Sequence, residues 1–491
     1  MSELLIGVDA GTTGIRSMVF DRDLNVLGEE YKGCSLIRLS DRYVEQDANE
    51  WWELVKTVVK TSIDKSAVNP EEIKAISVSS QGIAIVPVDK NCNTLRNAIS
   101  WLDTRASDET NTILEKYNAF DVYKKTGKRI NETYTLPKIM WVKNNEPEIY
   151  NQTYKFLMPH DYIIAKMCGI FATDHTMASG TMAYNIHDQN WWSEILEACD
   201  IDISKLPDIK QSAAPQGTLL KSAADEMGLP KEVIVSVGGQ DQKLASLGAG
   251  IGNDIITVSL GTATAIEKIF DYPIIDSKMR IPSFTYLFKN QWVAEGVVST
   301  SGVSLNWLKN TLFKDKTYKD LDNIAKEVED TPSSIFFFPF LSGCGSPHWY
   351  KNAAGCFYGI SLATSEADII KSVLEGVAYQ IRENIEVMES NDGQIKKDYS
   401  LRVMGGGASS DIWLKIIANI TGKTVSTLYT HETACVGAAI LSGIGAGIFN
   451  NEDEAKKNIK IRDVYYSEKN CVNAYNRKYE EYIKMQDKIM G

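Results

Sequence analysis

The sequence predicts an α/β protein built from two related halves. Its 491 residues are enough for two large domains or for three of ordinary size. Short apolar runs of strand length alternate with stretches in which apolar residues recur at helical spacing. A strand, a small-residue turn and a second strand occur near the N-terminus and again about 250 residues later. This repetition favours two halves of one architecture.

The first half opens with a predicted meander of three strands, separated by the turn Gly11–Gly14 and by a polar turn at Asp21–Asn25. A helix follows, because Asp47–Glu50 is typical of an N-cap and apolar residues continue at helical spacing from Trp51 to Val59. The strands of this half are expected at Leu4–Val8, Ile15–Phe20, Val26–Tyr31, Ile73–Ser79, Ile83–Val88 and Val233–Val237.

The second half repeats the strand–turn–strand pattern. Its first strand, turn and second strand are expected at Ile255–Leu260, Gly261–Thr264 and Ala265–Ile269. The glycine-rich stretch Gly248–Gly252 lies between the two occurrences of the pattern, and glycine clusters mark loops and boundaries. We therefore predict one domain at residues 1–247 and another at 248–491.

Composition and charge exclude several classes of function. Lys and Arg number 52 against 64 Asp and Glu, and this net charge of −12 repels nucleic-acid phosphates where no basic patch opposes it. The longest strongly apolar stretch, Ile335–Leu341, contains a proline and is too short to span a bilayer. The N-terminus lacks the pattern of a signal peptide, and the eight cysteines form no C-x-x-C motif. We expect a cytoplasmic protein that binds neither nucleic acid nor membranes.

The first glycine turn, Asp9–Gly14, directly follows a predicted strand and has residues suited to a phosphate. Its glycines leave room for a close ligand oxygen, while Thr12 and Thr13 supply hydroxyl and backbone donors. Asp9 is suited to hold Mg²⁺ through water, and Arg16 to neutralise a transferring phosphoryl group. The turn is neither a Walker A loop nor a dinucleotide-binding fingerprint, and an ordinary hairpin turn is the alternative.

Two further turns repeat this pattern. Gly261 and Thr262 follow the first strand of the second half, and the triple glycine Gly405–Gly407 follows another apolar run. A helix begins after the triple glycine, capped by Ser409 or Ser410, and its dipole would face a bound phosphate. A tight strand–helix turn would explain the triple glycine by itself. Three such turns in one chain, however, favour a phosphate ligand.

An acidic centre is predicted where Asp241 and Gln242 follow the glycine pair Gly238–Gly239. In a glycine loop, an Asp carboxylate can accept the proton of a substrate hydroxyl while that oxygen attacks phosphorus. Gln242 is a neutral hydrogen-bonding partner suited to a polyol. An Asx turn is the alternative for this short segment.

Two long motifs carry a family resemblance. Gly355–Ile360, a seven-residue gap and Asp368–Glu375 form one motif, and Thr135–Trp141 forms the other. They resemble the C-terminal signature and most of the N-terminal signature of the FGGY carbohydrate kinases, the family of glycerol kinase, xylulokinase and gluconate kinase. The resemblance runs over the whole chain and favours the xylulokinase branch. It implies two RNase H-like domains of the actin, Hsp70 and sugar-kinase superfamily, flanking a catalytic cleft.

The resemblance also implies roles for individual residues. Asp9 would correspond to the essential Asp near Mg²⁺, and Asp241 to the catalytic base with Gln242 as a neighbouring substrate contact. Glu295 and Gly296 begin a segment that resembles a later part of the ATP site. The residues implied to contact ATP or its phosphates are Thr12, Thr13, Arg16, Gly261, Thr262, Gly302, Asn306, Gly406, Gly407 and Asp411, the last standing where glycerol kinase has Asn.

The implied sugar contacts are Gln81, Gly82, Trp101, Asp103 and Gln242. Gly82 and Ile83 lack polar side chains, so the Arg–Glu clamp of glycerol kinase is missing. Trp101 would give an apolar wall, and Asp103 would accept sugar hydroxyls. The resemblance therefore implies a ketopentose substrate such as xylulose, with gluconate, a tetritol, a deoxyketose or a furanone precursor as alternatives.

The expected reaction transfers a phosphoryl group from ATP, with Mg²⁺, to a primary hydroxyl of a small sugar. The same duplicated core also serves actin- and Hsp70-like ATPases, which use ATP to switch a binding surface. A non-catalytic sugar sensor on a kinase scaffold is a third interpretation. Asp9, Asp241 and the Gly261–Thr262 turn favour the enzyme. A homodimer stays open as the oligomeric state.

Overall fold

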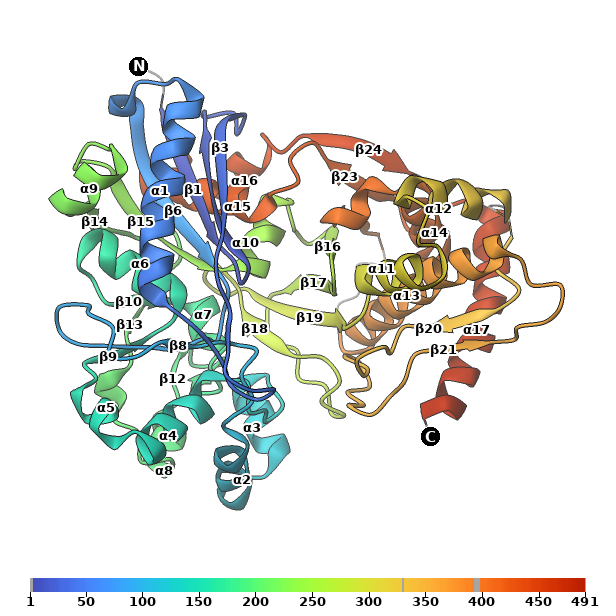
Figure 1. Ribbon diagram of the computed structural model, residues 1–491, viewed down its shortest axis with the longest axis horizontal. Coiled ribbons are helices and arrows are strands. Elements are labelled where there is room, and N and C mark those ends of the chain that lie inside the picture. Colours follow the sequence, from blue (N-terminus) through green and yellow to red (C-terminus); the bar gives the residue numbers. More distant parts are fainter. Residues whose placement is uncertain (1–2, 329–330, 393–397, 491) are drawn as a thin grey trace.

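Two large mixed β-sheets organise the computed structural model, which describes residues 3–328, 331–392 and 398–490 (Figure 1). The first sheet contains β1 (Leu4–Ala10), β2 (Gly14–Phe20), β3 (Val26–Gly33), β6 (Ile73–Ser80), β14 (Pro215–Thr218) and β15 (Ile234–Gln240). The second contains β16 (Ile255–Leu260), β17 (Thr264–Phe270), β18 (Ser283–Thr285), β19 (Trp292–Val298), β22 (Ser400–Met404), β23 (Val425–Leu428) and β24 (Ile461–Tyr465).

The two sheets share a core topology. The first contains the order β3-β2-β1-β6-β15, and the second contains β19-β17-β16-β22-β23. In the first sheet, β1, β2 and β3 form an antiparallel meander, and in the second β16, β17 and β19 do the same. In each sheet the last two strands of the shared order, β6 and β15 or β22 and β23, add in parallel beside the first strand of the meander. The repeat in the sequence is therefore a duplicated topology, and the prediction of an α/β fold built from two related halves is confirmed.

Most predicted elements are present with small shifts at their ends. Helix α1 (Ala48–Ser66) begins where the sequence predicted, because the Asp47 side chain accepts a hydrogen bond from the Asn49 N–H at 2.8 Å. It ends at Ala67, which adopts a left-handed conformation. The strand expected at Ile83–Val88 is shorter, since only β7 (Val86–Val88) is regular.

Helices cover both sheets. Those of the first lobe, besides α1, are α2 (Ser107–Lys116), α3 (Ala119–Thr126), α4 (Thr135–Asn145), α5 (Pro147–Gln152), α6 (Pro159–Cys168), α7 (His175–Ser179), α8 (Ser193–Ala198) and α9 (Lys221–Met227). The second lobe has α11 (Gly302–Leu312), α12 (Tyr318–Ala325), α13 (Glu366–Ser390), α14 (Asp411–Thr421), α16 (Glu452–Lys456) and α17 (Lys469–Met490). Short strands form small sheets at the periphery: β4 (Ile37–Arg38), β5 (Val44–Gln46), β8 (Ala98–Ile99), β9 (Lys155–Leu157), β10 (Ala172–Asp174), β11 (Tyr184–Asn185), β12 (Asn190–Trp191), β13 (Asp208–Lys210), β20 (Phe336–Phe338) and β21 (Cys356–Tyr358).

Two helices at the interface between the lobes are exchanged, in the sense that each contacts the sheet of the other lobe. Helix α10 (Asp241–Gly248) follows β15 of the first sheet, but its Ser246 hydroxyl lies 2.8 Å from the Thr257 hydroxyl on β16 of the second sheet. Helix α15 (Thr433–Gly445) follows β23 of the second sheet and packs on β1, β6 and β15 of the first (Figure 1). The two helices also pack against each other and share one apolar cluster with both sheets.

Glycines permit this close packing. A Cβ atom at Gly7 on β1 would lie 2.0 Å from the Cys435 carbonyl oxygen on α15. One at Gly437 would lie 2.0 Å from the Leu244 carbonyl oxygen on α10. Backbones approach so closely only where side chains are absent. The boundary that we propose between residues 247 and 248 therefore separates the strands of the two sheets but not the helices that cover them.

Candidate functional site

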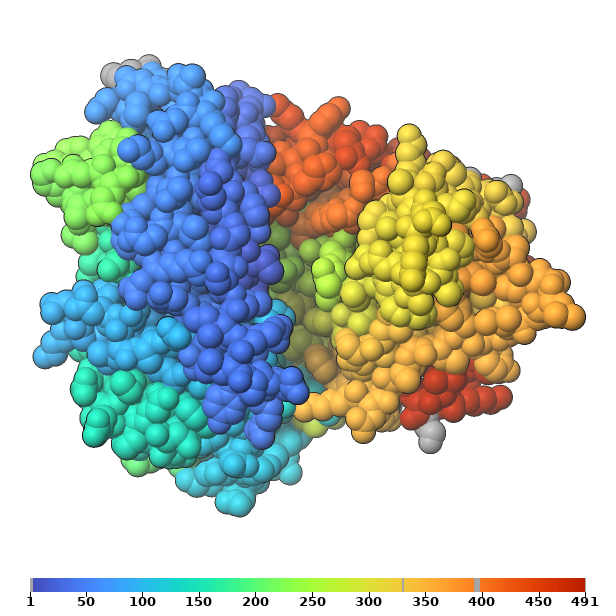
Figure 2. Space-filling model, in the orientation of Figure 1, coloured from blue at the N-terminus to red at the C-terminus, as the bar shows by residue number. Residues whose placement is uncertain are grey.

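A cavity of about 390 Å³ lies between the lobes, where the space-filling view shows a cleft (Figure 2). The first lobe lines it with Thr12, Gln81, Gly82, Ile83, Trp101, Thr133, Tyr134, Thr176, Met177, Gly180, Gln240, Asp241 and Gln242. The second lobe adds Ser259, Ala263, Thr264, Ala265, Pro282, Phe284, Glu295, Val297 and Trp349. Its size suits a small molecule, and it reaches from the predicted sugar contacts to the turn around Gly261.

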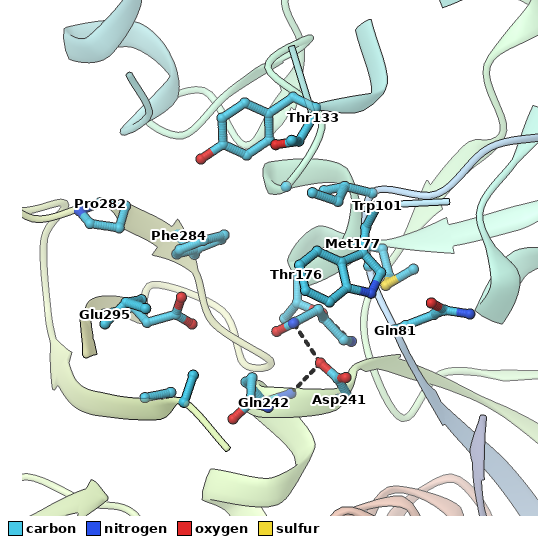
Figure 3. A pocket seen from close by; sticks show the side chains of 18 of the residues that line it. Gln81, Trp101, Thr133, Thr176, Met177, Asp241, Gln242, Pro282, Phe284 and Glu295 are labelled. Atoms are coloured by element: carbon cyan, nitrogen blue, oxygen red, sulfur yellow. Dashed lines mark hydrogen bonds between the residues drawn. The ribbon is translucent and has the colours of Figure 1, made fainter. Parts of the chain in front are cut away.

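Asp241 is the first residue of α10, so the glycine loop expected around it is instead a strand end and a helix N-terminus. Its Oδ1 accepts hydrogen bonds from the Gln242 N–H at 2.7 Å and from Gln240 Nε2 at 2.6 Å (Figure 3). Burial, and then the charge of Asp9, raise the pKa of Asp241 to about 7. A carboxylate with such a pKa can exchange a proton near neutral pH.

Asp9 lies on β1 beside the first glycine turn. Its Oδ1 accepts a hydrogen bond from the Ser79 hydroxyl at 2.7 Å. Burial raises the pKa of Asp9 to about 6, the Ser79 hydrogen bond opposes this rise, and the charge of Glu432 adds to it. Sequence reasoning did not identify Ser79 as a partner, although the parallel pairing of β1 with β6 places it directly opposite Asp9.

A hydrogen-bond network joins the first glycine turn to the predicted sugar contacts. Trp101 Nε1 donates to the Thr12 hydroxyl at 2.8 Å, and that hydroxyl donates to Gln81 Oε1 at 3.2 Å. Gln81 Nε2 donates to Gln46 Oε1 at 3.0 Å, and Gln46 Nε2 donates back to the Thr12 carbonyl oxygen at 3.0 Å. Sequence reasoning missed Gln46, which lies on β5. The network fixes one side of the cavity.

Asp103 lies outside this cavity, contrary to the role that the resemblance implied. Its side chain is fully buried, and both of its oxygens accept hydrogen bonds from the Arg105 guanidinium, at 2.9 and 2.8 Å. One of these oxygens also accepts the Val44 N–H at 2.6 Å. Because the carboxylate already has these partners, its role is to hold the chain that carries Trp101. The spacing Asp-x-Arg was a signal of this pair in the sequence.

The glycine turns of the second lobe meet one another. The Gly302 N–H donates to the Gly261 carbonyl oxygen at 2.9 Å, and a Cβ at Gly302 would lie 2.5 Å from that oxygen. A Cβ at Gly407 would clash with Leu260 at 2.5 Å, directly before the Gly261 turn. Gly406 faces open space. Ser410 caps α14 as one of the two predicted serines, accepting the Trp413 N–H at 3.3 Å.

Other predicted ATP contacts lie around these turns. Asn306 on α11 is exposed and accepts a hydrogen bond from the Tyr318 hydroxyl at 2.9 Å. Asp411 at the start of α14 is also exposed and accepts one from the Tyr465 hydroxyl at 2.6 Å. Their contacts with a nucleotide stay predictions, as do those of the remaining exposed donors, Thr13 and Thr262.

Arg16 on β2 is held by two carboxylates. It pairs with Glu432 at 3.1 Å and with Glu29 at 3.4 Å. Glu432 lies immediately before α15, so this ion pair joins the first sheet to a segment from the second half of the sequence. A role for Arg16 in phosphoryl transfer stays a prediction.

Glu295 begins the segment that resembles a later part of the ATP site. It lies on β19, and its side chain lines the cavity opposite Asp241 (Figure 3). Strand alternation explains this, since Glu295 and Val297 point to the cavity while Gly296 packs against Asn384 on α13. Phe284 on β18 lies beside it and was not singled out in the sequence.

The surroundings of Asp9 fit Mg²⁺, because this carboxylate lies at the end of β1, beside the turn that is suited to a phosphate. Within the described ranges, no group of three or more His, Cys, Asp or Glu side chains is arranged to hold a metal by itself. Mg²⁺ is commonly held by one or two carboxylates together with water and substrate phosphates. Burial and the charge of Glu432 raise the pKa of Asp9, and burial and the charge of Asp9 raise the pKa of Asp241. A divalent cation beside Asp9 would offset this negative charge. In the part of the chain that the structure describes, no helix has the length and apolar composition to cross a membrane.

Comparison with known proteins identifies relatives along nearly the whole chain. The xylulose kinase of Staphylococcus epidermidis (strain RP62A) is 30% identical over 490 residues, covering 98% of this chain and 96% of the relative. The gluconokinase of Bacillus subtilis (strain 168) is 28% identical over 473 residues, covering 92% and 90%. The structure of a gluconate kinase from Lactobacillus acidophilus matches with a TM-score of 0.93 at 25% identity, covering 100% of this chain and 99% of that chain.

A ligand-bound xylulose kinase from Lactobacillus acidophilus matches with a TM-score of 0.92 at 25% identity, covering 99% of this chain and 98% of that one. Family models give the same assignment in two parts. The N-terminal domain of the FGGY family of carbohydrate kinases matches residues 4–248, and its C-terminal domain matches residues 256–446. The chain therefore belongs to the FGGY family of carbohydrate kinases and is an enzyme that transfers a phosphoryl group from ATP to a sugar.

Proposed function

We propose that this kinase phosphorylates a primary hydroxyl of an open-chain ketopentose such as xylulose, with Asp241 as the general base. One observation carries the proposal. A single cavity extends from Asp241 and the Gln81–Trp101 side to the residues around the second glycine turn, Ser259 and Ala263. A small sugar bound in that cavity would present a hydroxyl between the carboxylate and the terminal phosphate of ATP.

The chemistry of Asp241 supports its role. Its Oδ1 already accepts two protein hydrogen bonds, which leaves Oδ2 to accept the hydroxyl proton as the oxygen attacks phosphorus. With a pKa of about 7, the carboxylate is ionised above neutral pH and is basic enough to help the transfer. Gln242, the next residue along α10, lines the same cavity and is suited to orient the sugar.

Charge on the moving phosphoryl group would be balanced by the glycine turns. The backbone N–H groups near Gly11 and Gly261, with the hydroxyls of Thr12 and Thr262, are suited to the phosphate oxygens. Asp9 is the residue that would hold Mg²⁺, through water, and the ion when bound would supply positive charge beside the phosphates. Closure of the two lobes would exclude water, whose attack on ATP competes with transfer to the sugar.

Relatives and cavity together limit the alternatives. The xylulose kinases and the gluconokinase among the relatives make a ketopentose and an aldonate the leading candidates. A polyol or another ketose would also fit a cavity of about 390 Å³. The actin- and Hsp70-like class is disfavoured, because a base facing a sugar-sized cavity is not needed for an ATPase that switches a binding surface.

A coupled assay for ADP production tests the proposal. Purified enzyme with ATP and Mg²⁺ is offered pentuloses, aldonates and polyols one at a time, and the product of the best substrate is examined by NMR. We expect ADP production to depend on a ketopentose and the phosphate to be attached to a primary carbon. ADP production that proceeds equally without any sugar would contradict the proposal and favour the ATPase switch.

A further inference from the structure

The end of the cavity opposite Asp241 carries a second carboxylate, that of Glu295. This carboxylate belongs to a cluster with two buried charged residues, Glu267 and Lys243. Glu295 on β19 and Glu267 on β17 are directly opposite one another in the antiparallel register. Like charges at such positions destabilise a sheet. The pair persists because Lys243 of α10 contacts both carboxylates, Glu295 at 2.5 Å, and is itself fully buried.

The two carboxylates differ in ionisation. Burial alone would raise the pKa of Glu295, but Lys243 outweighs it and holds the pKa below its usual value. Burial raises the pKa of Glu267, which faces the interior. Burial would lower the pKa of Lys243, yet the two glutamates outweigh it and raise that pKa. Glu295 is therefore the member of the cluster that keeps its negative charge at neutral pH.

Aromatic packing fixes this cluster at the cavity wall. Lys243 Nζ lies 4.1 Å from the centre of the Phe284 ring, and Lys128 Nζ lies 3.4 Å from it. Phe284 and Glu295 both line the cavity, and the Glu295 carboxylate is directed into it (Figure 3). A carboxylate held at the wall of a sugar-sized cavity is a ready acceptor for hydroxyl hydrogens.

No positive side chain of the described residues lines the cavity beside these carboxylates, since Lys243 pairs with Glu295 from behind the wall. Among the described residues that line it there is no Lys, Arg or His, whereas Asp241 and Glu295 are both present. Lys128 and Lys138 lie behind the wall, and burial lowers the pKa of each. A carboxylate on the ligand would therefore meet two carboxylates at the wall, while the charge of Lys243 is already shared by Glu295 and Glu267.

A neighbouring depression does contain cations. Arg129 and Lys351 line it, and it shares Thr133, Tyr134, Pro282 and Trp349 with the cavity. Lys351, however, pairs with Glu132 at 3.1 Å, and the guanidinium of Arg129 reaches the Met279 carbonyl oxygen at 3.4 Å. These cations thus line the neighbouring depression and not the cavity, and each has a partner of its own.

The geometry points to Glu295 as a residue that binds the sugar and determines its charge class. It accepts hydroxyl hydrogens from the end of the sugar chain remote from Asp241, and with Asp241 it selects a neutral ketose or polyol against an aldonate. Lys243 and Glu267 position this carboxylate. The inference rests on the proposed function, which concerns the end of the site where phosphoryl transfer occurs. It adds the residue that binds the other end of the sugar.

Binding of two matched five-carbon ligands tests the inference. Xylitol and xylonate have the same chain length, but one ends in a hydroxymethyl group and the other in a carboxylate. Trp101 and Trp349 both line the cavity, so tryptophan fluorescence reports their binding without turnover, and calorimetry verifies the dissociation constants. At pH 8 we expect wild-type protein to bind xylitol at least about 30-fold more tightly than xylonate, since like charges at close range repel strongly.

Variants assign the preference to a residue. Glu295→Gln keeps the shape of the side chain and removes its charge. We expect this variant to bind xylitol about tenfold more weakly, because a charged hydrogen-bond acceptor is lost. The preference for xylitol over xylonate, measured as the ratio of their dissociation constants, should decrease about tenfold. Glu132→Gln is the matched control, since it removes an ion-paired glutamate outside the cavity, and it should leave the ratio unchanged. Glu295→Asp serves if the first variant does not fold, because its shorter side chain withdraws the carboxylate from the ligand.

Two results would overturn the inference. One is equal binding of xylonate and xylitol by the wild-type protein, and the other is an unchanged ratio in a folded Glu295 variant. The proposed function is tested separately by the assay for ADP. An enzyme that phosphorylates no sugar in the panel would contradict that function, while the binding ratio would still decide the role of Glu295.

Discussion

The substitution Asp241→Asn tests the centre of the mechanism. In the wild-type protein, Oδ1 accepts hydrogen bonds from Gln240 and from the Gln242 N–H, at 2.6 and 2.7 Å. An Asn that keeps these bonds through its carbonyl oxygen must place its NH₂ group where Oδ2 stood. The position that should accept a proton then offers only donors. We expect kcat to fall by about 10²–10⁴, or about 3–5 kcal/mol of transition-state stabilisation.

The measurement combines turnover with binding. A coupled assay gives kcat and KM for the preferred sugar, and calorimetry gives the dissociation constant for ATP, which should change by less than about threefold because the substitution removes no phosphate donor. Asp225→Asn is the matched control, since that aspartate is exposed on α9 and pairs with Lys221 on the same helix. A variant at position 241 that retains kcat within a few-fold of the wild-type value would refute the role of base.

Three further predictions follow from the same geometry. The kcat/KM for the sugar should fall tenfold per pH unit below about pH 7, because Asp241 must be ionised to act and burial raises its pKa to about 7, as a pH–rate profile would test. Trp101→Phe removes the hydrogen bond to Thr12, and kinetics should give a KM for the sugar about three- to tenfold higher with an unchanged melting temperature, because the ring is 39% exposed. Gly437→Ala should lower the melting temperature by several degrees or prevent folding, because a Cβ atom there would lie 2.0 Å from a backbone oxygen. Gly406→Ala should leave the melting temperature unchanged, because a Cβ atom there meets nothing within 4 Å. Equal melting temperatures for these two variants would contradict the packing described for α15.

Local patterns predicted most of the first sheet, because its strands are short apolar runs beside turns. In the second sheet they predicted β16, β17 and β22, while β18, β19, β23 and β24 were not predicted. The duplicated turns at Gly11 and Gly261 even revealed that the lobes are related. The exchange of α10 and α15 was not predictable in the same way. It depends on contacts between segments that are about 190 residues apart for α10 and α15 and about 430 residues apart for β1 and α15, and neither helix sequence indicates which sheet it will cover. The glycines at 7 and 437 acquire a meaning only once their partners are known.

The candidate site divides along the same line. Asp9, Asp241 and Gln81 belong to local motifs, and the structure brings all three to one cleft. Asp103 stands in an equally suggestive motif, but a side chain two residues away takes its oxygens. Glu295 was placed with the nucleotide because its neighbours in sequence resemble that segment, and only the strand register reveals which face of β19 it occupies.

The helix exchange has a consequence for how activity arises during folding. Asp241 lies on α10, which contacts the second sheet, and α15 packs on the first sheet, whose strand β15 leads into Asp241. A chain emerging during synthesis therefore completes its N-terminal lobe only when residues near 440 have been made. Until then the first sheet lacks α15, and the helix that carries Asp241 lacks the second sheet against which it packs. An incomplete chain therefore cannot turn over ATP. Separately produced halves would each expose an apolar surface, and they would have to recombine before either became active.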